Sequence, residues 1–154
     1  MLNVLLYLFE HQLINDETFT DDLVETQQQL IAEGFPPQSI QQALRWLKEL
    51  QYQHREAVLI NNFAADSIRV WLPEEQHKLS ADGMAFLLKL ESQGVITPEL
   101  REVIIDRAMA LAAPMVDVYQ LKWIVLIVMY HYQQEDFSVP WLEHVLLNES
   151  LHMH

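Results

Sequence analysis

The segment from Val118 to about Gln133 limits the fold more than any other part of the chain, because it is apolar on nearly every side of a helix. Its most apolar part, Trp123 to Tyr132, is shorter than the roughly 20 residues that a membrane-spanning helix needs. A helix of this kind is stable in water only when other helices surround it. We therefore expect a mostly α-helical protein with no membrane span, in which this helix is central and Trp123 is buried.

Apolar residues recur at helical spacing along most of the remaining chain. Gly34 and Gly94 each follow the last apolar position of such a stretch, where glycine commonly ends a helix. Thr97-Pro98-Glu99 places an N-cap, a first-turn proline and an acidic residue in order, and Asp117 can cap the next helix. The expected helices cover about residues 2–11, 20–33, 37–50, 82–93, 97–112, 118–133 and 138–146, with a further helix opening at Pro73.

Between residues 57 and 72 the apolar pattern becomes that of strands. Ala57–Ile60 and Ser67–Leu72 are short β-branched runs around Asn61-Asn62, which predicts a two-stranded hairpin. Three helices followed by a hairpin is the order of elements in a winged-helix domain. We therefore predict a winged-helix-like N-terminal subdomain, residues 1–72, packed on a C-terminal helical bundle, residues 73–154.

The charge of the chain restricts the partners it can bind. Twenty-two acidic residues against nine lysines and arginines give a formal net charge of −13, and no lysine or arginine precedes Arg45. Such a charge repels a phosphate backbone at long range, so we expect no tight binding to generic duplex DNA. The absence of cysteine excludes disulfides and thiolate chemistry, and it suits a cytoplasmic protein.

One candidate interaction surface follows from the winged-helix prediction. The third helix would carry the recognition face, and its polar side chains lie opposite its apolar stripe. The hairpin would add Arg69 and Trp71, a pair of residue types enriched at interface hot spots. An ordinary solvent-facing helix has the same pattern, and Trp71 fits burial against the second subdomain equally well. The predicted surface comprises Gln38, Gln41, Gln42, Arg45, Lys48, Arg69 and Trp71.

The turn before the third helix offers a second kind of surface. Gly34-Phe35, followed by Ala43-Leu44, resembles the Gly-Phe turn and last helix that form the binding patch of ubiquitin-associated-type modules. The simpler interpretation, which we favour, is that Phe35 staples the next helix, which begins near Pro37.

Two pairs of residues have the spacing of metal ligands. Glu74-x-x-His77 and Glu149-x-x-His152 match the pattern of di-metal helical bundles. A chain with 22 acidic residues and seven histidines produces such matches by chance, so we predict no metal site.

Glu102 and Asp106 share one face of their helix and are the remaining candidates for chemistry. Two close carboxylates can share a proton or hold a cation. We favour ion pairs with Arg101, Arg107 or a neighbouring base, the usual arrangement of charges within an apolar helix. Because no nucleophile elbow, phosphate loop or dinucleotide fingerprint is present, we predict no catalytic residue and no cofactor.

Several segments occur in the order and spacing of one bacterial family. They are VLLYLFE (4–10), the EGF…I..AL.WL pattern (33–47), LINN (59–62), PEEQ (73–76), REVIIDRAMAL (101–111) and LKWIVLIVM (121–129). Together they resemble the Smg family nearly from end to end. The chain departs from the family pattern at Trp71-Leu72, where Tyr-Thr is expected, and at Pro114–Tyr119, which is less acidic than usual.

The resemblance implies a cytoplasmic bacterial protein, and it supplies no mechanism because the function of the family is unknown. Genes of the family often lie near that of a DNA-processing protein, which the resemblance makes a candidate partner. We expect a non-enzymatic protein that acts through protein–protein contacts. The alternative is a DNA-associated winged-helix factor linked to DNA processing, which would gather Arg45, Lys48, Arg55 and Arg69 into one positive face.

Overall fold

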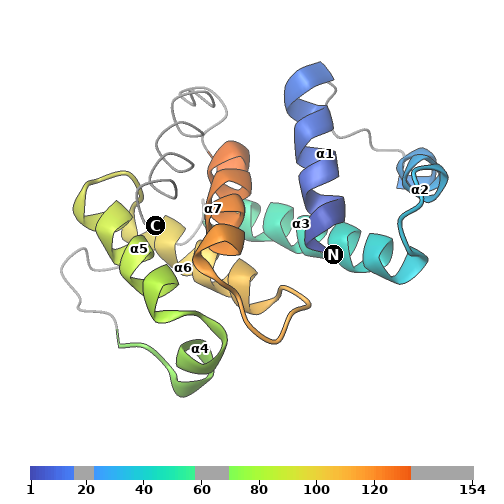
Figure 1. Cartoon of the computed structure of the whole chain (residues 1–154). Coiled ribbons are helices and arrows are strands. Elements are labelled where there is room, and N and C mark those ends of the chain that lie inside the picture. The colour runs from blue at the N-terminus through green and yellow to red at the C-terminus, as the bar shows by residue number, and fades with distance from the viewer. Residues whose placement is uncertain (16–22, 58–69, 133–154) are drawn as a thin grey trace. The chain divides into compact units, whose positions relative to one another are not determined.

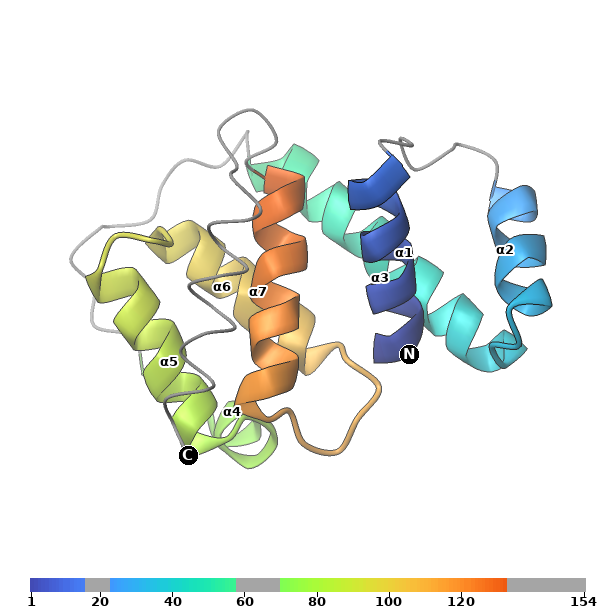
Figure 2. The same cartoon turned by 45° about the horizontal axis from the view of Figure 1, so that its top comes forward.

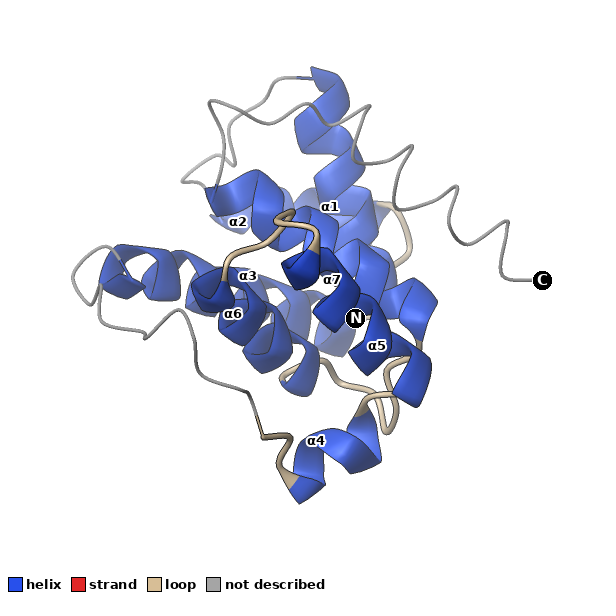
Figure 3. Cartoon of the chain, turned by 90° about the vertical axis from the view of Figure 1, so that its left-hand side faces the viewer, coloured by secondary structure: helices blue, strands red, loops and turns tan. Residues whose placement is uncertain are grey.

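The structure, a computed structural model of the chain, describes residues 1–15, 23–57 and 70–132. These ranges form helices and no β-strand, which confirms the prediction of a mostly α-helical protein (Figures 1 and 3). None of these helices is both long enough and apolar enough to cross a membrane. The helices are α1 (Leu2–Asn15), α2 (Leu23–Ala32), α3 (Pro37–Ala57), α4 (Pro73–Lys78), α5 (Ala81–Ser92), α6 (Pro98–Met109) and α7 (Val118–Tyr132).

The chain divides into two compact units, Met1–Glu49 and Leu50–His154, with the division inside α3. The subdomain boundary between residues 72 and 73 stays a prediction. In the first unit the apolar faces of all three helices are buried, and Trp46 is the largest of these side chains at 2% exposure. The buried set is Val4, Leu5, Leu8 and Phe9 from α1, Leu30 from α2, and Ile40, Ala43, Leu44, Trp46 and Leu47 from α3.

Two glycines end helices as their positions in the sequence predicted. Gly34 and Gly94 have φ angles of 93° and 72°, a left-handed conformation that costs other residues free energy. In both turns the residue after the glycine donates its N–H to the carbonyl five residues earlier, at 3.2 Å after α2 and 2.9 Å after α5. This hydrogen bond, typical of the Schellman motif, uses a carbonyl that the helix end would otherwise leave without a partner.

In the second unit α7 is the central helix, as its apolar pattern predicted. Both α5 and α6 pack against it (Figures 1 and 2), and every residue from Ile124 to Met129 is buried. Gly83 permits the close approach of α5, because a Cβ atom at this position would lie 3.2 Å from Leu121 Cδ2. Trp123 differs from the prediction. It is only half-buried, whereas its neighbours Lys122 and Ile124 are buried.

Short contacts join α4 to the loop between α6 and α7. Leu79 and Val116 form an isolated parallel bridge, in which the Val116 N–H donates to the Lys78 carbonyl at 2.8 Å. Lys78 Nζ donates to the carbonyls of Met109 and Leu111 at 2.6 and 2.7 Å. These carbonyls lie at the C-terminal end of α6 and just beyond it, where a cation is favoured by the helix dipole. Partial burial lowers the pKa of the Lys78 ammonium from its ordinary value.

The predicted β-hairpin is not found among the described residues. Ala57, the first residue of the expected first strand, is the last residue of α3. Residues 51–57 are mostly good helix formers, and they extend the helix beyond Leu50, where its regular apolar stripe ends. Val70–Leu72 form an irregular segment before α4. The rest of the predicted hairpin and the helix predicted from Ser138 lie outside the described residues.

Candidate functional site

Five of the seven residues of the predicted surface lie on α3. Gln38, Gln41, Arg45 and Lys48 are exposed, whereas Gln42 is half-buried. Steps of three, four and three residues place the four exposed side chains along one side of the helix. We call these four residues the α3 stripe.

The opposite side of α3 determines which way the stripe faces. Ile40, Ala43, Trp46 and Leu47 are each at most 5% exposed. Because these apolar side chains are removed from water, the polar side chains between them must point outward. The orientation of the stripe is therefore set by the hydrophobic burial of α3 and does not depend on the polar residues themselves.

The charge of the α3 stripe contrasts with that of the first unit. Arg45 and Lys48 are the only basic residues among positions 1–49, which also hold eight acidic residues. Arg45 Nε lies 3.4 Å from Glu49 Oε1, and the two side chains are 82% and 45% exposed. Such an exposed pair contributes at most ~0.5 kcal/mol, so a partner's carboxylate can replace Glu49 at little cost.

Tyr52 is a residue that the sequence analysis missed. It lies four residues after Lys48 on the same helix and is 63% exposed. The prediction ended the helix at Leu50 and so left Tyr52 without a defined face. The helix-forming composition of residues 51–57 is the signal that would have placed it beside the stripe.

The other two residues of the predicted surface belong to the second unit. Trp71 is half-buried just before α4, and its carbonyl accepts a hydrogen bond from Gln76 Nε2 at 3.0 Å. Arg69 lies outside the described residues. A joint surface of Arg69, Trp71 and the α3 stripe therefore stays a prediction.

Phe35 packs within the first unit against α1, and the predicted contact with the next helix, α3, stays a prediction. Its ring meets that of Tyr7 in α1 edge to face, with centroids 5.4 Å apart, and the side chain is half-buried. Desolvation and the neighbouring Glu33 carboxylate raise the pKa of the Tyr7 hydroxyl above its ordinary value. This contact favours a structural role for the Gly34-Phe35 turn over a ubiquitin-associated-type binding patch.

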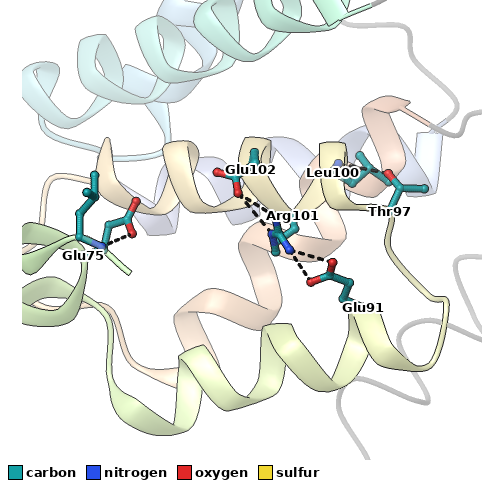
Figure 4. A network of polar contacts seen from close by, with 7 residues as sticks. Glu75, Glu91, Thr97, Leu100, Arg101 and Glu102 are labelled. Carbon is teal, nitrogen blue, oxygen red and sulfur yellow. Dashed lines mark hydrogen bonds and ion pairs between the residues drawn. The ribbon is translucent and has the colours of Figure 1, made fainter. Parts of the chain in front are cut away.

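Glu102 and Asp106 form ion pairs with adjacent arginines, as favoured from the sequence. Arg101 Nη2 lies 3.0 Å from Glu102 Oε1, and Arg101 Nη1 donates to both carboxylate oxygens of Glu91 at 2.7 and 2.8 Å (Figure 4). Arg107 pairs with Asp106 at 2.8 Å. Because Glu91 belongs to α5 and Arg101 to α6, the first network joins two helices of the core. We therefore assign these carboxylates a structural role.

Within the described ranges, no three histidine, aspartate or glutamate side chains gather where they could hold a metal ion. His77 of the first Glu-x-x-His match is exposed in α4. Another acidic residue of the same short helix has a structural role. Glu75 is 6% exposed, and its Oε2 accepts the N–H of Leu72 at 3.0 Å, which caps the start of α4 (Figure 4). Glu149 and His152 lie outside the described residues.

Comparison with known proteins shows similarity over the whole chain. A family model described as "Protein of unknown function (DUF494)" matches residues 1–154. The chain is 35% identical to a Protein Smg homolog of Thioalkalivibrio sulfidiphilus over 149 residues, covering 96% of this chain and 93% of that protein. It is 34% identical to a Protein Smg homolog of Vibrio cholerae over 151 residues, with 97% and 96% covered. No solved structure matches the chain.

Proposed function

The chain belongs to the Smg family, a family of unknown function also described as DUF494, and we propose that it is a non-enzymatic cytoplasmic protein that binds another protein through the α3 stripe. One observation carries this proposal. The only two basic side chains of residues 1–49 lie one turn apart on the exposed side of a helix whose other side is buried.

The chemistry of the α3 stripe indicates which kind of surface it can bind. Gln38 and Gln41 each carry a donor and an acceptor group, whereas Arg45 and Lys48 only donate. Hydrogen bonds from these cations to carboxylates are stronger than neutral ones, and arginine can bind a carboxylate with two parallel hydrogen bonds. The best-matched partner is a protein surface that presents carboxylates and carbonyls along about three helical turns.

A DNA-associated winged-helix factor is the second candidate. The observation in its favour is that exposed arginine and glutamine on one helix are the side chains that read guanine and adenine edges. The charge opposes it, because residues 1–49 carry a formal net charge of −6 and Glu49 already pairs with Arg45. Phosphate contacts supply most of the affinity of DNA-binding proteins, and two cations provide few of them. We therefore rank protein binding first.

Site-specific photo-crosslinking in the bacterium that produces the protein tests this proposal. A photoreactive phenylalanine derivative replaces Gln41 in the stripe, and the control places it at Gln28, an exposed glutamine of α2 in the same unit. We expect a discrete protein adduct from position 41, absent from position 28 and lost when Arg45→Glu reverses the charge of the stripe. Adducts of equal yield from both positions, or adducts to nucleic acid alone, would contradict the proposal.

A further inference from the structure

A second surface, at the start of α7, has the opposite character to the α3 stripe. Met115 and Tyr119 are 60% and 52% exposed, and the ring of Tyr119 lies edge-on to that of Trp123 with centroids 6.4 Å apart. We call these three residues the α7 patch. They recur at intervals of four residues, so Tyr119 and Trp123 share a face of α7, and Met115 lies in the loop that leads into it.

The residue types of the α7 patch are those of binding surfaces. Tyrosine, tryptophan and methionine are enriched at protein interfaces because they bury large areas with few rotatable bonds or adapt their shape. Isolated exposed apolar residues are common, so the residue types alone do not identify a partner. The charge of the surrounding surface indicates which kind of partner the patch can bind.

Most basic side chains of the second unit form contacts within that unit. Residues 70–132 contain five lysines and arginines and eight acidic residues. Arg101 and Arg107 are at most 6% exposed and lie in ion pairs, Lys122 is 1% exposed with its ammonium 5.3 Å from the centre of the Phe86 ring, and Lys78 is bound to backbone carbonyls. Of the five, Lys89 alone is exposed.

The exposed charge of this region is therefore mostly negative. Four acidic side chains are exposed against the single exposed lysine, and one of them, Asp117, caps α7 two residues before Tyr119. The exposed acidic residues are Glu74, Asp82, Asp117 and Asp106, the last of which pairs with Arg107. A potential of this sign attracts cations and repels anions. Contact with the faces of tyrosine and tryptophan rings further stabilises a bound lysine or arginine.

From these observations we infer that the α7 patch binds a basic amphipathic segment of a partner protein, with large apolar side chains on one face and lysine or arginine on the other. The apolar face would cover Met115, Tyr119 and Trp123, and a cation beside it would meet Asp117 within a unit whose exposed charge is mostly negative. This inference does not depend on the proposed function, because the α7 patch and the α3 stripe lie on different helices and select opposite charges.

A titration of the full chain into labelled peptides tests the inference. The first peptide is an amphipathic helix of about 18 lysines and leucines, about five turns long, and the second has glutamate in place of every lysine. Fluorescence anisotropy should show the lysine peptide binding at least about tenfold more tightly than the glutamate peptide, a difference of about 1.4 kcal/mol.

A pair of variants locates the binding site. Met115→Ala with Tyr119→Ala should weaken binding of the lysine peptide about tenfold or more, because both side chains contribute contact area. Leu88→Ala is the matched control, since Leu88 is an exposed large apolar residue of α5, 44% exposed, in the same unit. It should change binding by less than about twofold. Thermal melting of both variants checks that the fold is retained.

Four results would overturn the inference. They are no binding of the lysine peptide to the unmodified chain, equal binding of both peptides, equal loss in the Met115/Tyr119 and Leu88 variants, and no loss in the Met115/Tyr119 variant. Sedimentation velocity adds a fifth test. A dimer of the unmodified chain that dissociates in the Met115/Tyr119 variant would mean that a second copy covers the α7 patch, which also contradicts the inference.

Discussion

Replacing Glu91 with glutamine tests how much the ion-pair network between α5 and α6 contributes to stability. Arg101 Nη1 donates to both oxygens of Glu91, and the arginine side chain is only 7% exposed (Figure 4). Glutamine keeps the size of the side chain but removes the charge and one of the two acceptors. In this variant Glu102 is the carboxylate of the network that still pairs with the buried guanidinium of Arg101.

The expected loss follows from the burial of the two partners. A hydrogen bond to a charged group contributes roughly 1.5–3 kcal/mol, and breaking a fully buried ion pair costs about 3–5 kcal/mol. The Glu91 side chain is 24% exposed and Glu102 still faces the guanidinium, so the loss should lie near or below the lower end of the first range. We expect Glu91→Gln to lower the free energy of unfolding by about 1–2 kcal/mol, or the melting temperature by about 2–8 °C for a chain of this length.

Glu49→Gln provides a matched control for this measurement. It makes the same change in a glutamate that also pairs with an arginine, but here the arginine side chain is 82% exposed. Its cost should stay within about 0.5 kcal/mol. Urea unfolding followed by circular dichroism measures both variants. Equal losses in the two variants, or no loss in Glu91→Gln, would refute the argument that burial makes the Glu91–Arg101 pair important.

Three further predictions follow. Trp46→Ala should lower the free energy of unfolding by about 3–5 kcal/mol, because Trp46 is 2% exposed. Trp123→Ala should lower it by about half as much, because Trp123 is only half-buried, and urea titrations of both variants measure the difference. Gly83→Ala should not stabilise the protein in a thermal melt, since the added Cβ lies 3.1 Å from Ser80 Oγ and 3.2 Å from Leu121 Cδ2, which offsets the ~1 kcal/mol gain in helix propensity. Fluorescence anisotropy should detect no submicromolar, salt-sensitive binding to random duplex DNA, and such binding would favour the DNA-associated alternative over protein binding.

The helix ends could be predicted because their causes are local. Gly34 and Gly94 end α2 and α5 through a backbone conformation that glycine adopts readily. Thr97 caps α6 by accepting the N–H of Leu100 at 3.2 Å, and Asp117 caps α7 by accepting that of Gln120 at 2.8 Å. Each of these interactions lies within six residues of the chain, so the order of residue types is enough to anticipate it.

The region after Leu50 was harder to predict because two local preferences compete there. The regular apolar stripe of α3 ends at Leu50, which led to a predicted end of the helix. Residues 51–57 nevertheless favour helix by composition, and α3 continues to Ala57. Periodicity reports which residues will be buried, whereas helix formation itself needs no buried face once a helix is already nucleated.

The candidate site was predicted in part. The face of α3 that carries Gln38, Gln41, Arg45 and Lys48 follows from helical spacing, and the structure places these side chains in solvent. The α7 patch was not predicted, because Trp123 lies in the most apolar stretch of the chain and was expected to be buried. Its half-exposure depends on which sides of α7 are covered by α5 and α6, and the sequence of α7 does not contain this information.

The family, most of the described helices, the central place of α7 and the polar side of α3 follow from the sequence alone, because each depends on neighbouring residues and on the period of the helix. Which charges remain available for binding depends on how the helices pack. Arg45 and Arg101 look alike in the sequence, yet Arg45 is in solvent and Arg101 is enclosed between two carboxylates. The physical reason is that Arg101 meets Glu91 through the packing of α6 on α5, and burial strengthens that pairing while it removes the charge from the surface.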